Sequence, residues 1–328
     1  MSIQKIRFIP IVLLMLISFA ACQDDTTVNP VKWTQMTDLS KFGGTARASA
    51  TCFVIGKKAY VCCGRSGWRD GFLKEVWEYD SETDTWTRKR DFPGPARVKA
   101  VAGVIGTKAY MGMGAVGAYE PKNLFKDFWE YDSQTDTWIQ KAAFPDSASN
   151  DLFAAVVDGA FYTVAGFDGI TRKYTCYKYD PQINVWTKLH DSPFSYSNRA
   201  GFSLGNCFYV GTGFRGSNMS TIFRYRPADG QWRKVANVPD GRMLSNGLAI
   251  GNKGYILLGR YWNGYLNNGR LLSDIVEYDP ATDAWTKRGN FAGGARQNAV
   301  VFQIDGTGYI AMGEDDTNRK SDVWSFKP

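Results

Sequence analysis

A tryptophan recurs along this chain at intervals of about 50 residues, and this repeat constrains the fold more than any other feature. Its positions are Trp33, Trp86, Trp138, Trp186, Trp232 and Trp285. In the last five units a tyrosine stands seven positions earlier, at Tyr79, Tyr131, Tyr179, Tyr225 and Tyr278. A second tyrosine, followed four positions later by glycine, recurs in phase, and the glycines are Gly64, Gly114, Gly166, Gly213, Gly259 and Gly313. Such a period indicates a repeat architecture.

Each repeat has the pattern of four short strands. The first two are joined by tight turns such as Gly56-Lys57 and Asp158-Gly159, which are strong hairpin signals. The second strand ends at the recurring glycine, and a short polar turn joins the third strand to the one that carries the tryptophan. Because helical periodicity is absent, we predict an all-β radial array. Stacked units bury the faces that one unit leaves open, and the Tyr/Trp pairs supply packing area.

These units resemble Kelch repeats, in which an arginine precedes the first strand and Tyr-x-x-Gly-Gly, Tyr-Asp and Trp follow. The resemblance covers nearly all of residues 32–328 and implies a propeller fold. Two departures stand out. The glycine pair is reduced to one glycine, as in Cys63-Gly64 and Met113-Gly114, and the third unit has Ser149-Asn150 where the arginine is expected.

The sixth unit lacks a fourth strand, because the chain ends shortly after residues 323–326. The N-terminus supplies an unassigned strand at residues 31–35, so we predict a six-bladed β-propeller of four-stranded blades whose last blade the N-terminal strand closes. The propeller spans residues 31–328. Its predicted blades are approximately residues 47–91, 97–144, 149–192, 199–238, 242–291, and 296–328 together with 31–36.

Residues 1–21 have the pattern of a secretory signal peptide. Lys5 and Arg7 precede an apolar run that is too short to span a bilayer, which needs about 20 residues. Ala20-Ala21-Cys22 resembles a lipobox, although Phe19 departs from it. This resemblance implies that Cys22 is lipidated and that residues 22–30 are a polar tether. The alternative is an ordinary cleaved signal with a stray cysteine.

We therefore expect the protein to be lipid-anchored in the outer membrane of a cell envelope. Residues 23–25, Gln-Asp-Asp, resemble an acidic surface-export tag, and a plain solvated tether is the alternative. A periplasmic and a surface-exposed location both remain open.

Composition excludes several classes of function. The net charge of +7 is not gathered into a Lys/Arg block, so we expect no nucleic-acid partner. His190 is the only histidine, which argues against His-based metal sites and catalytic triads, and we expect neither a metal nor a cofactor. The remaining cysteines are best explained as buried apolar side chains, while a disulfide between Cys52 and Cys62 or Cys63 stays open.

Variable loops should gather on one face, where the connections between second and third strands and the links between blades lie. They are rich in Trp, Tyr, Arg, Gly and Asn, which are favoured in recognition surfaces. The alternative is that the aromatic side chains only cap the blades. The loop residues predicted to bind a ligand are Arg65, Trp68, Tyr119, Arg215, Tyr261 and Trp262.

A second set of candidates is the arginine at the start of each first strand. First strands line the channel of a propeller, so we expect the guanidinium groups to form a basic collar that suits a carboxylate or an acidic peptide. The alternative is that they only tie blades together. The predicted collar consists of Arg47, Arg97, Arg199, Arg242 and Arg296.

Two functions are considered. The first is a membrane-tethered binding module, rather than an enzyme, for a glycan or protein ligand on the long-loop face. The second is a sialic-acid-like sugar-acid epimerase or mutarotase, which similarity of layout to secreted six-bladed Kelch proteins implies. That chemistry needs an arginine and one acid/base carboxylate. The candidate carboxylates, among which the spacing does not select, are Glu120, Asp168, Glu314 and Asp315.

Overall fold

The structure is a computed structural model. It describes residues 31–67, 70–117, 120–264 and 269–328. The predicted signal peptide, the tether with Cys22, and the loop residues Trp68 and Tyr119 lie outside the described residues. Within the described residues, no helix has the length and hydrophobicity required to cross a membrane.

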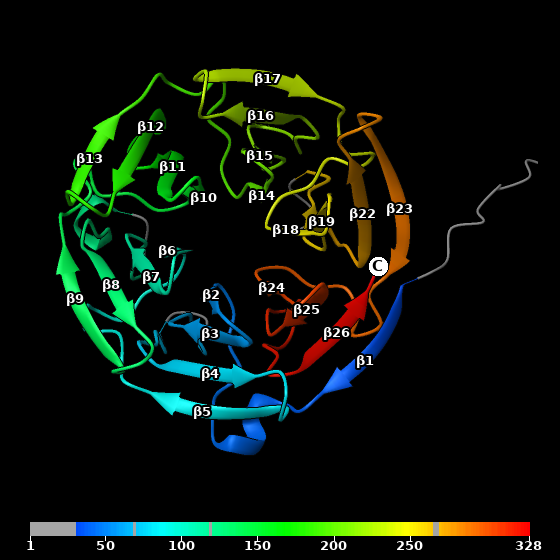
Figure 1. The fold of residues 1–328 in the computed structure, drawn as a ribbon. Coiled ribbons are helices and arrows are strands. Elements are labelled where there is room, and N and C mark those ends of the chain that lie inside the picture. The colour runs from blue at the N-terminus through cyan, green and yellow to red at the C-terminus, as the bar shows by residue number, and fades with distance from the viewer. Residues whose placement is uncertain (1–30, 68–69, 118–119, 265–268) are drawn as a thin grey trace, which may run out of the picture.

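The described residues form six four-stranded antiparallel sheets arranged around an axis, which confirms the predicted propeller (Figure 1). Blade 1 consists of β2 (Thr51–Ile55), β3 (Lys58–Cys62), β4 (Val76–Asp80) and β5 (Thr85–Lys89). Blade 2 consists of β6 (Val101–Ile105), β7 (Lys108–Gly112), β8 (Phe128–Asp132) and β9 (Thr137–Lys141). Blade 3 consists of β10 (Phe153–Val157), β11 (Ala160–Phe167), β12 (Arg172–Asp180) and β13 (Val185–Lys188).

The remaining blades follow the same order. Blade 4 consists of β14 (Ala200–Leu204), β15 (Cys207–Gly211), β16 (Ile222–Arg226) and β17 (Gln231–Val235). Blade 5 consists of β18 (Asn246–Ile250), β19 (Lys253–Leu257), β22 (Asp274–Asp279) and β23 (Ala284–Asn290). Blade 6 consists of β24 (Val300–Ile304), β25 (Thr307–Ala311), β26 (Val323–Lys327) and β1 (Lys32–Met36). Outside the blades lie a small ribbon, β20 (Arg260–Tyr261) with β21 (Arg270–Leu271), and two 3-10 turns, η1 (Leu39–Phe42) and η2 (Pro121–Asn123).

The two ends of the propeller meet in blade 6. Strand β1 pairs antiparallel with β26, with Trp33 opposite Phe326, and the two rings lie 4.9 Å apart. This pairing confirms the predicted closure. It covers the edge of β26 that would otherwise be open to another chain.

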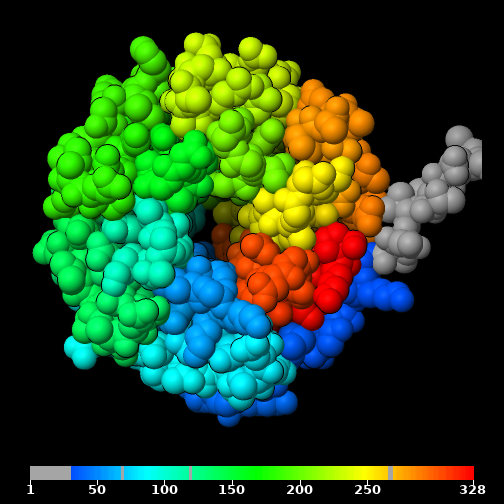
Figure 2. Space-filling view, in the orientation of Figure 1, coloured from blue at the N-terminus to red at the C-terminus, as the bar shows by residue number. Residues whose placement is uncertain are grey.

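The innermost strands surround a central channel, and the outermost strands follow one another around the rim (Figures 1 and 2). The aromatic repeat fills the space between blades. Tyr79 lies 5.0 Å from Trp86 of its own blade and 5.9 Å from Tyr309 of blade 6, and both distances are between ring centroids. Edge-on and tilted ring contacts of this kind stabilise beyond the area that they bury.

The first glycine of the Kelch glycine pair is replaced in this chain, but the backbone at that position keeps a left-handed conformation. The residue before each recurring glycine has a positive φ although it is not glycine, and it is held there by the packing around it. These left-handed residues, buried in every blade, are Cys63, Met113, Ala165, Thr212, Leu258 and Met312.

Candidate functional site

Four of the predicted collar arginines are closed off from any ligand. Arg47, Arg97, Arg242 and Arg296 are at most 1% exposed. Each donates to the carbonyl of the left-handed residue that precedes its blade's recurring glycine. Each also pairs with a carboxylate just before, or at the start of, the third strand, and the partners are Glu75, Asp127, Asp274 and Asp322 respectively. The expectation of a basic collar is wrong for these four, because their charge is neutralised inside their own blades.

The prediction that Arg199 belongs with these four arginines is also wrong. The four buried arginines stand two positions before a left-handed residue, and in blade 4 that residue is Asn198. The matching position is therefore Tyr196, three residues before Arg199, so blade 4 also begins earlier than predicted. The sequence itself indicates that blade 4 lacks the buried arginine. Blades 3 and 4 lack the partner carboxylate as well, and they have Thr175 and Thr221 in its place.

Arg199 instead lies at the mouth of the channel and is half-buried. Its guanidinium donates to the backbone carbonyls of Asp151 and Tyr196. Burial lowers the pKa of Arg199 to about 10, while the charge of Asp151 acts in the opposite direction. The side chain is therefore still a cation at neutral pH.

A ring of left-handed residues, one from each blade, forms this mouth. Backbone hydrogen bonds link neighbours in the ring: the Ser49 N–H donates to Asn298 at 3.0 Å, and the Asn298 N–H donates to Leu244 at 3.2 Å. These hydrogen bonds fix the backbone of the residues that form the mouth. The ring residues, with φ between 52° and 56°, are Ser49, Lys99, Asp151, Asn198, Leu244 and Asn298.

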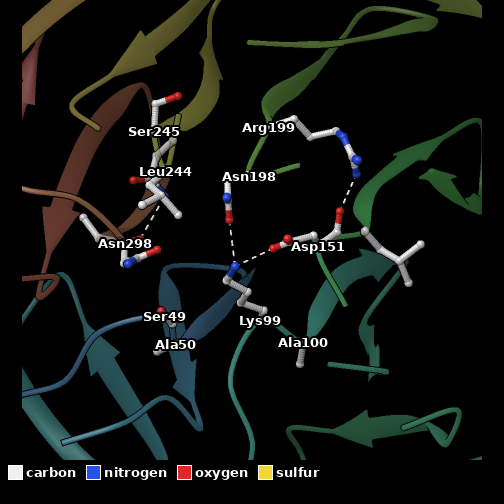
Figure 3. Close-up of a pocket in the computed structure, with 13 residues that line it drawn as sticks. Ser49, Ala50, Lys99, Ala100, Asp151, Asn198, Arg199, Leu244, Ser245 and Asn298 are labelled. Atoms are coloured by element: carbon white, nitrogen blue, oxygen red, sulfur yellow. Dashed lines mark hydrogen bonds and ion pairs between the residues drawn. The ribbon is translucent and has the colours of Figure 1, made fainter. Parts of the chain in front are cut away.

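Side chains from blades 2, 3 and 4 converge at this mouth (Figure 3). Lys99 Nζ lies 2.5 Å from Asp151 Oδ1 and 2.7 Å from Asn198 Oδ1. These residues and Arg199 border a cavity of about 200 Å³. The cavity is polar, and its cations are already engaged by protein acceptors.

A second and larger pocket, of about 770 Å³, opens beside the mouth and shares Asn198 with it. Phe214, Met243, Tyr261 and Trp262 supply its apolar lining. These residues come from the loops and links of blades 4 and 5, so Tyr261 and Trp262 lie at the same pocket. We refer to this space as the aromatic pocket.

The backbone of the aromatic pocket is anchored by one amide side chain. Asn218 Nδ2 donates to the Trp262 carbonyl at 2.5 Å, and the Trp262 N–H donates back to Asn218 Oδ1 at 2.9 Å. Tyr261 remains 37% exposed, with the Arg270 guanidinium 5.7 Å from its ring centre. The pocket therefore combines a fixed backbone with an accessible aromatic ring.

The other predicted loop arginines do not line either cavity. Arg65 Nη2 lies 3.0 Å from the fully buried Glu314 Oε1, so it connects blade 1 to blade 6. Arg215 is exposed. It lies near Tyr174, whose pKa is lowered by a hydrogen bond with Ser195 and by the charge of Arg215.

The candidate acid/base carboxylates are poorly placed for proton transfer. Burial acts to raise the pKa of Asp168, but hydrogen bonds from Lys173 and from two backbone N–H groups hold it below its ordinary value. The pKa of Asp315 is lowered in the same way, by hydrogen bonds from Lys320 and from neighbouring N–H groups. Glu120 is exposed beside Lys122, and Glu314 is enclosed away from both cavities.

The cysteines are free thiols in the part of the chain that the structure describes. Cys52 faces Val61 across the hairpin, whereas Cys62 faces Thr51, so Cys52 and Cys62 project to opposite sides of the sheet. Burial raises the pKa of Cys63 and Cys176 to about 12, which keeps both protonated. Among the described residues, no cluster of histidine, cysteine or carboxylate side chains could hold a metal ion.

The six blades, the closure by β1 and the repeated arginine–carboxylate pairs define a β-propeller built from Kelch repeats. Residues 49–259 match the family model of the KLHDC2/KLHL20/DRC7 Kelch-repeats domain, and the chain belongs to this Kelch-repeat family.

Similar proteins include Kelch-like protein 25 of Xenopus tropicalis, 28% identical over 73% of this chain, and Kelch-like protein 35 of Mus musculus, 25% identical over 88%. The matches span 40% and 48% of those relatives' lengths. Among solved structures, that of YjhT superposes with a TM-score of 0.71, at 17% identity, over 85% of this chain and 94% of its own. That likeness is one of fold.

Proposed function

We propose that this chain is a binding module that takes a protein ligand on its long-loop face. The observation that carries the proposal is the aromatic pocket, about 770 Å³ in volume, beside the polar mouth of the channel. A concave site with apolar walls and a few placed polar groups is the usual form of a ligand site. An apolar side chain of the ligand would fill the pocket, while Asn198 and Asn263 offer amides to its backbone.

Three features support binding rather than catalysis. The cations at the mouth are engaged by protein acceptors. The carboxyl groups of Asp168 and Asp315 stay ionised at neutral pH, so they cannot donate a proton as general acids. The aromatic pocket has Tyr and Trp in its lining, which are residue types that dominate binding energy at protein interfaces.

Tyr261→Ala is expected to weaken binding of the ligand about 10-fold or more, because a tyrosine in the lining of an apolar pocket is a typical hot spot. The measurement is titration calorimetry with a peptide selected on the full chain from a display library. Tyr174→Ala is the matched control, since Tyr174 is also 37% exposed but does not line the pocket. Both variants should keep the unfolding temperature of the parent protein.

A parallel glycan-array screen distinguishes the ligand classes. If only glycans bind, and Tyr261→Ala abolishes that binding, the site is correct and the assignment of a protein ligand is wrong. If selected peptides bind Tyr261→Ala as well as they bind the parent chain, the site itself is wrong.

We also propose that the propeller is held at a membrane by a lipid on Cys22, and the lipobox-like Ala20-Ala21-Cys22 supports this. Cys22→Ser is expected to move the protein from the membrane fraction to the soluble fraction and to abolish incorporation of a labelled fatty acid. Cys52→Ser is the control, since Cys52 lies in β2. If the parent protein incorporates no labelled fatty acid, the proposal of a lipid on Cys22 is wrong.

A further inference from the structure

Neighbouring blades are joined at the rim by a repeated polar contact, which we call the rim latch. In it, an Asp or Asn side chain in the turn before an outermost strand accepts two hydrogen bonds. Asp283 shows the pattern: Tyr278 of the same blade donates its hydroxyl at 2.8 Å, and the Ala236 N–H of the preceding blade donates at 2.9 Å.

The same geometry recurs in blades 1, 2 and 3, whereas the outermost strand of blade 6 is β1, which no such turn joins to β26. The acceptor always follows its tyrosine by five positions and has a positive φ of 51° to 55°. The tyrosine and backbone donors to each acceptor are Tyr79 and Thr37 for Asp84, Tyr131 and Arg90 for Asp136, and Tyr179 and Ala142 for Asn184.

Blade 4 lacks this acceptor. The position five residues after Tyr225 is Gly230, and its φ of 66° shows that the backbone keeps the latch conformation without the side chain. The matching backbone donor on blade 3 is the His190 N–H, which has no protein acceptor among the described residues, and the same holds for the Tyr225 hydroxyl. A Cβ built at Gly230 would meet only Tyr225 Oη, at 3.9 Å.

A pocket of about 420 Å³ lies at this position between blades 3 and 4. Lys188 and His190 are exposed at this pocket, and Leu189 and Pro227 provide apolar wall. The nearby carboxylate of Asp229 is already paired with Arg226 at 3.3 Å. Three groups therefore surround this pocket: the Tyr225 hydroxyl, the His190 backbone N–H and the Lys188 ammonium. At the other latches the corresponding space holds a carboxylate or an amide.

We propose that this pocket binds a small aliphatic carboxylic acid, whose carboxylate takes the place of the absent rim-latch side chain. One carboxylate oxygen accepts hydrogen bonds from Tyr225 Oη and from the His190 N–H, as Asp283 Oδ1 does between its own two donors. Lys188 supplies a positive charge at the entrance, and the alkyl part lies against Leu189 and Pro227. The ligand thereby joins blades 3 and 4.

The test compares thermal unfolding in acetate with unfolding in chloride at matched ionic strength. Acetate is expected to raise the unfolding temperature of the parent chain by about 2 °C or more, since a ligand of the folded state stabilises by mass action. Gly230→Asp supplies the carboxylate covalently, so it should unfold at a higher temperature in chloride and lose the acetate increment. Asp283→Gly opens an equivalent space between blades 4 and 5 and should enlarge the increment.

Two further measurements keep the result interpretable if a variant fails to fold. In the parent chain, acetate should shift the NMR signal of the His190 amide more than that of Ala142, whose N–H is already bound to Asn184. Butyrate should bind more tightly than acetate, because its longer alkyl part lies against Leu189 and Pro227, and equal affinity would overturn the aliphatic assignment. Tighter binding of N-acetyl-aspartate amide would assign the site to an acidic protein side chain and overturn the free-acid assignment. Equal acetate increments in the parent and in Gly230→Asp would overturn the site.

Discussion

Replacing Arg242 with methionine is expected to lower the free energy of unfolding by about 3–5 kcal/mol. Arg242 is fully buried and makes a paired contact with Asp274, at 2.9 Å and 2.7 Å. Methionine fills a similar volume, so the loss arises mainly from the Asp274 carboxylate, which is left buried without a counter-ion. Denaturant unfolding of the parent and variant chains measures the difference.

The chain itself offers the control for this prediction. Blade 3 has Ser149 and Thr175 where blade 5 has Arg242 and Asp274. The double substitution Arg242→Ser with Asp274→Thr should therefore be less destabilising than Arg242→Met alone, because no unpaired charge remains. A double variant that loses more stability than the single variant would show that the arginine acts through its packing, and the ion-pair explanation would fail.

Removing residues 1–36 is expected to abolish the cooperative unfolding transition and to cause aggregation. The deletion takes away β1, which exposes the edge of β26 and removes Trp33 from its contacts with Phe326 and Phe291. An open edge strand is a template for pairing with other chains. Circular dichroism during heating, together with size-exclusion chromatography, measures both effects.

A shorter deletion is the matched control. Removing residues 1–30 leaves β1 complete and should preserve the transition and a monodisperse elution profile. If the two deletions behaved alike and both stayed folded, closure of the ring by β1 would contribute nothing to stability. That outcome would contradict the structural role assigned to the pairing of β1 with β26.

The sequence pattern alone misplaced Arg199 relative to the arginines of the other blades. Arg199 stands at the start of a predicted first strand, as Arg47 does, so the sequence pattern groups the two residues. The equivalent positions are set instead by the left-handed residue, Ser49 in blade 1 and Asn198 in blade 4. The paired loss of arginine and carboxylate in blades 3 and 4 was readable in the sequence and would have corrected the grouping.

The candidate sites depend on contacts that no local pattern encodes. Lys99, Asp151 and Asn198 come from three blades, and the distances of their side chains follow from the curvature of the ring. At the rim, the sequence shows Gly230 where other repeats have Asp or Asn. Only the structure shows that the His190 N–H, which has no acceptor within the part of the chain that the structure describes, belongs to the preceding blade.

The sequence by itself determined the number of blades, their four-strand pattern and the closure by the N-terminal strand. It could do so because five blades bury a Tyr/Trp pair against a neighbour and blade 6 has Phe326 with Trp33 in its place. A repeated packing requirement leaves a repeated pattern. The tertiary structure alone decided which charged groups are accessible. Accessibility depends on the neighbours that burial brings around each charge, as the sealed Arg242 and the half-buried Arg199 show.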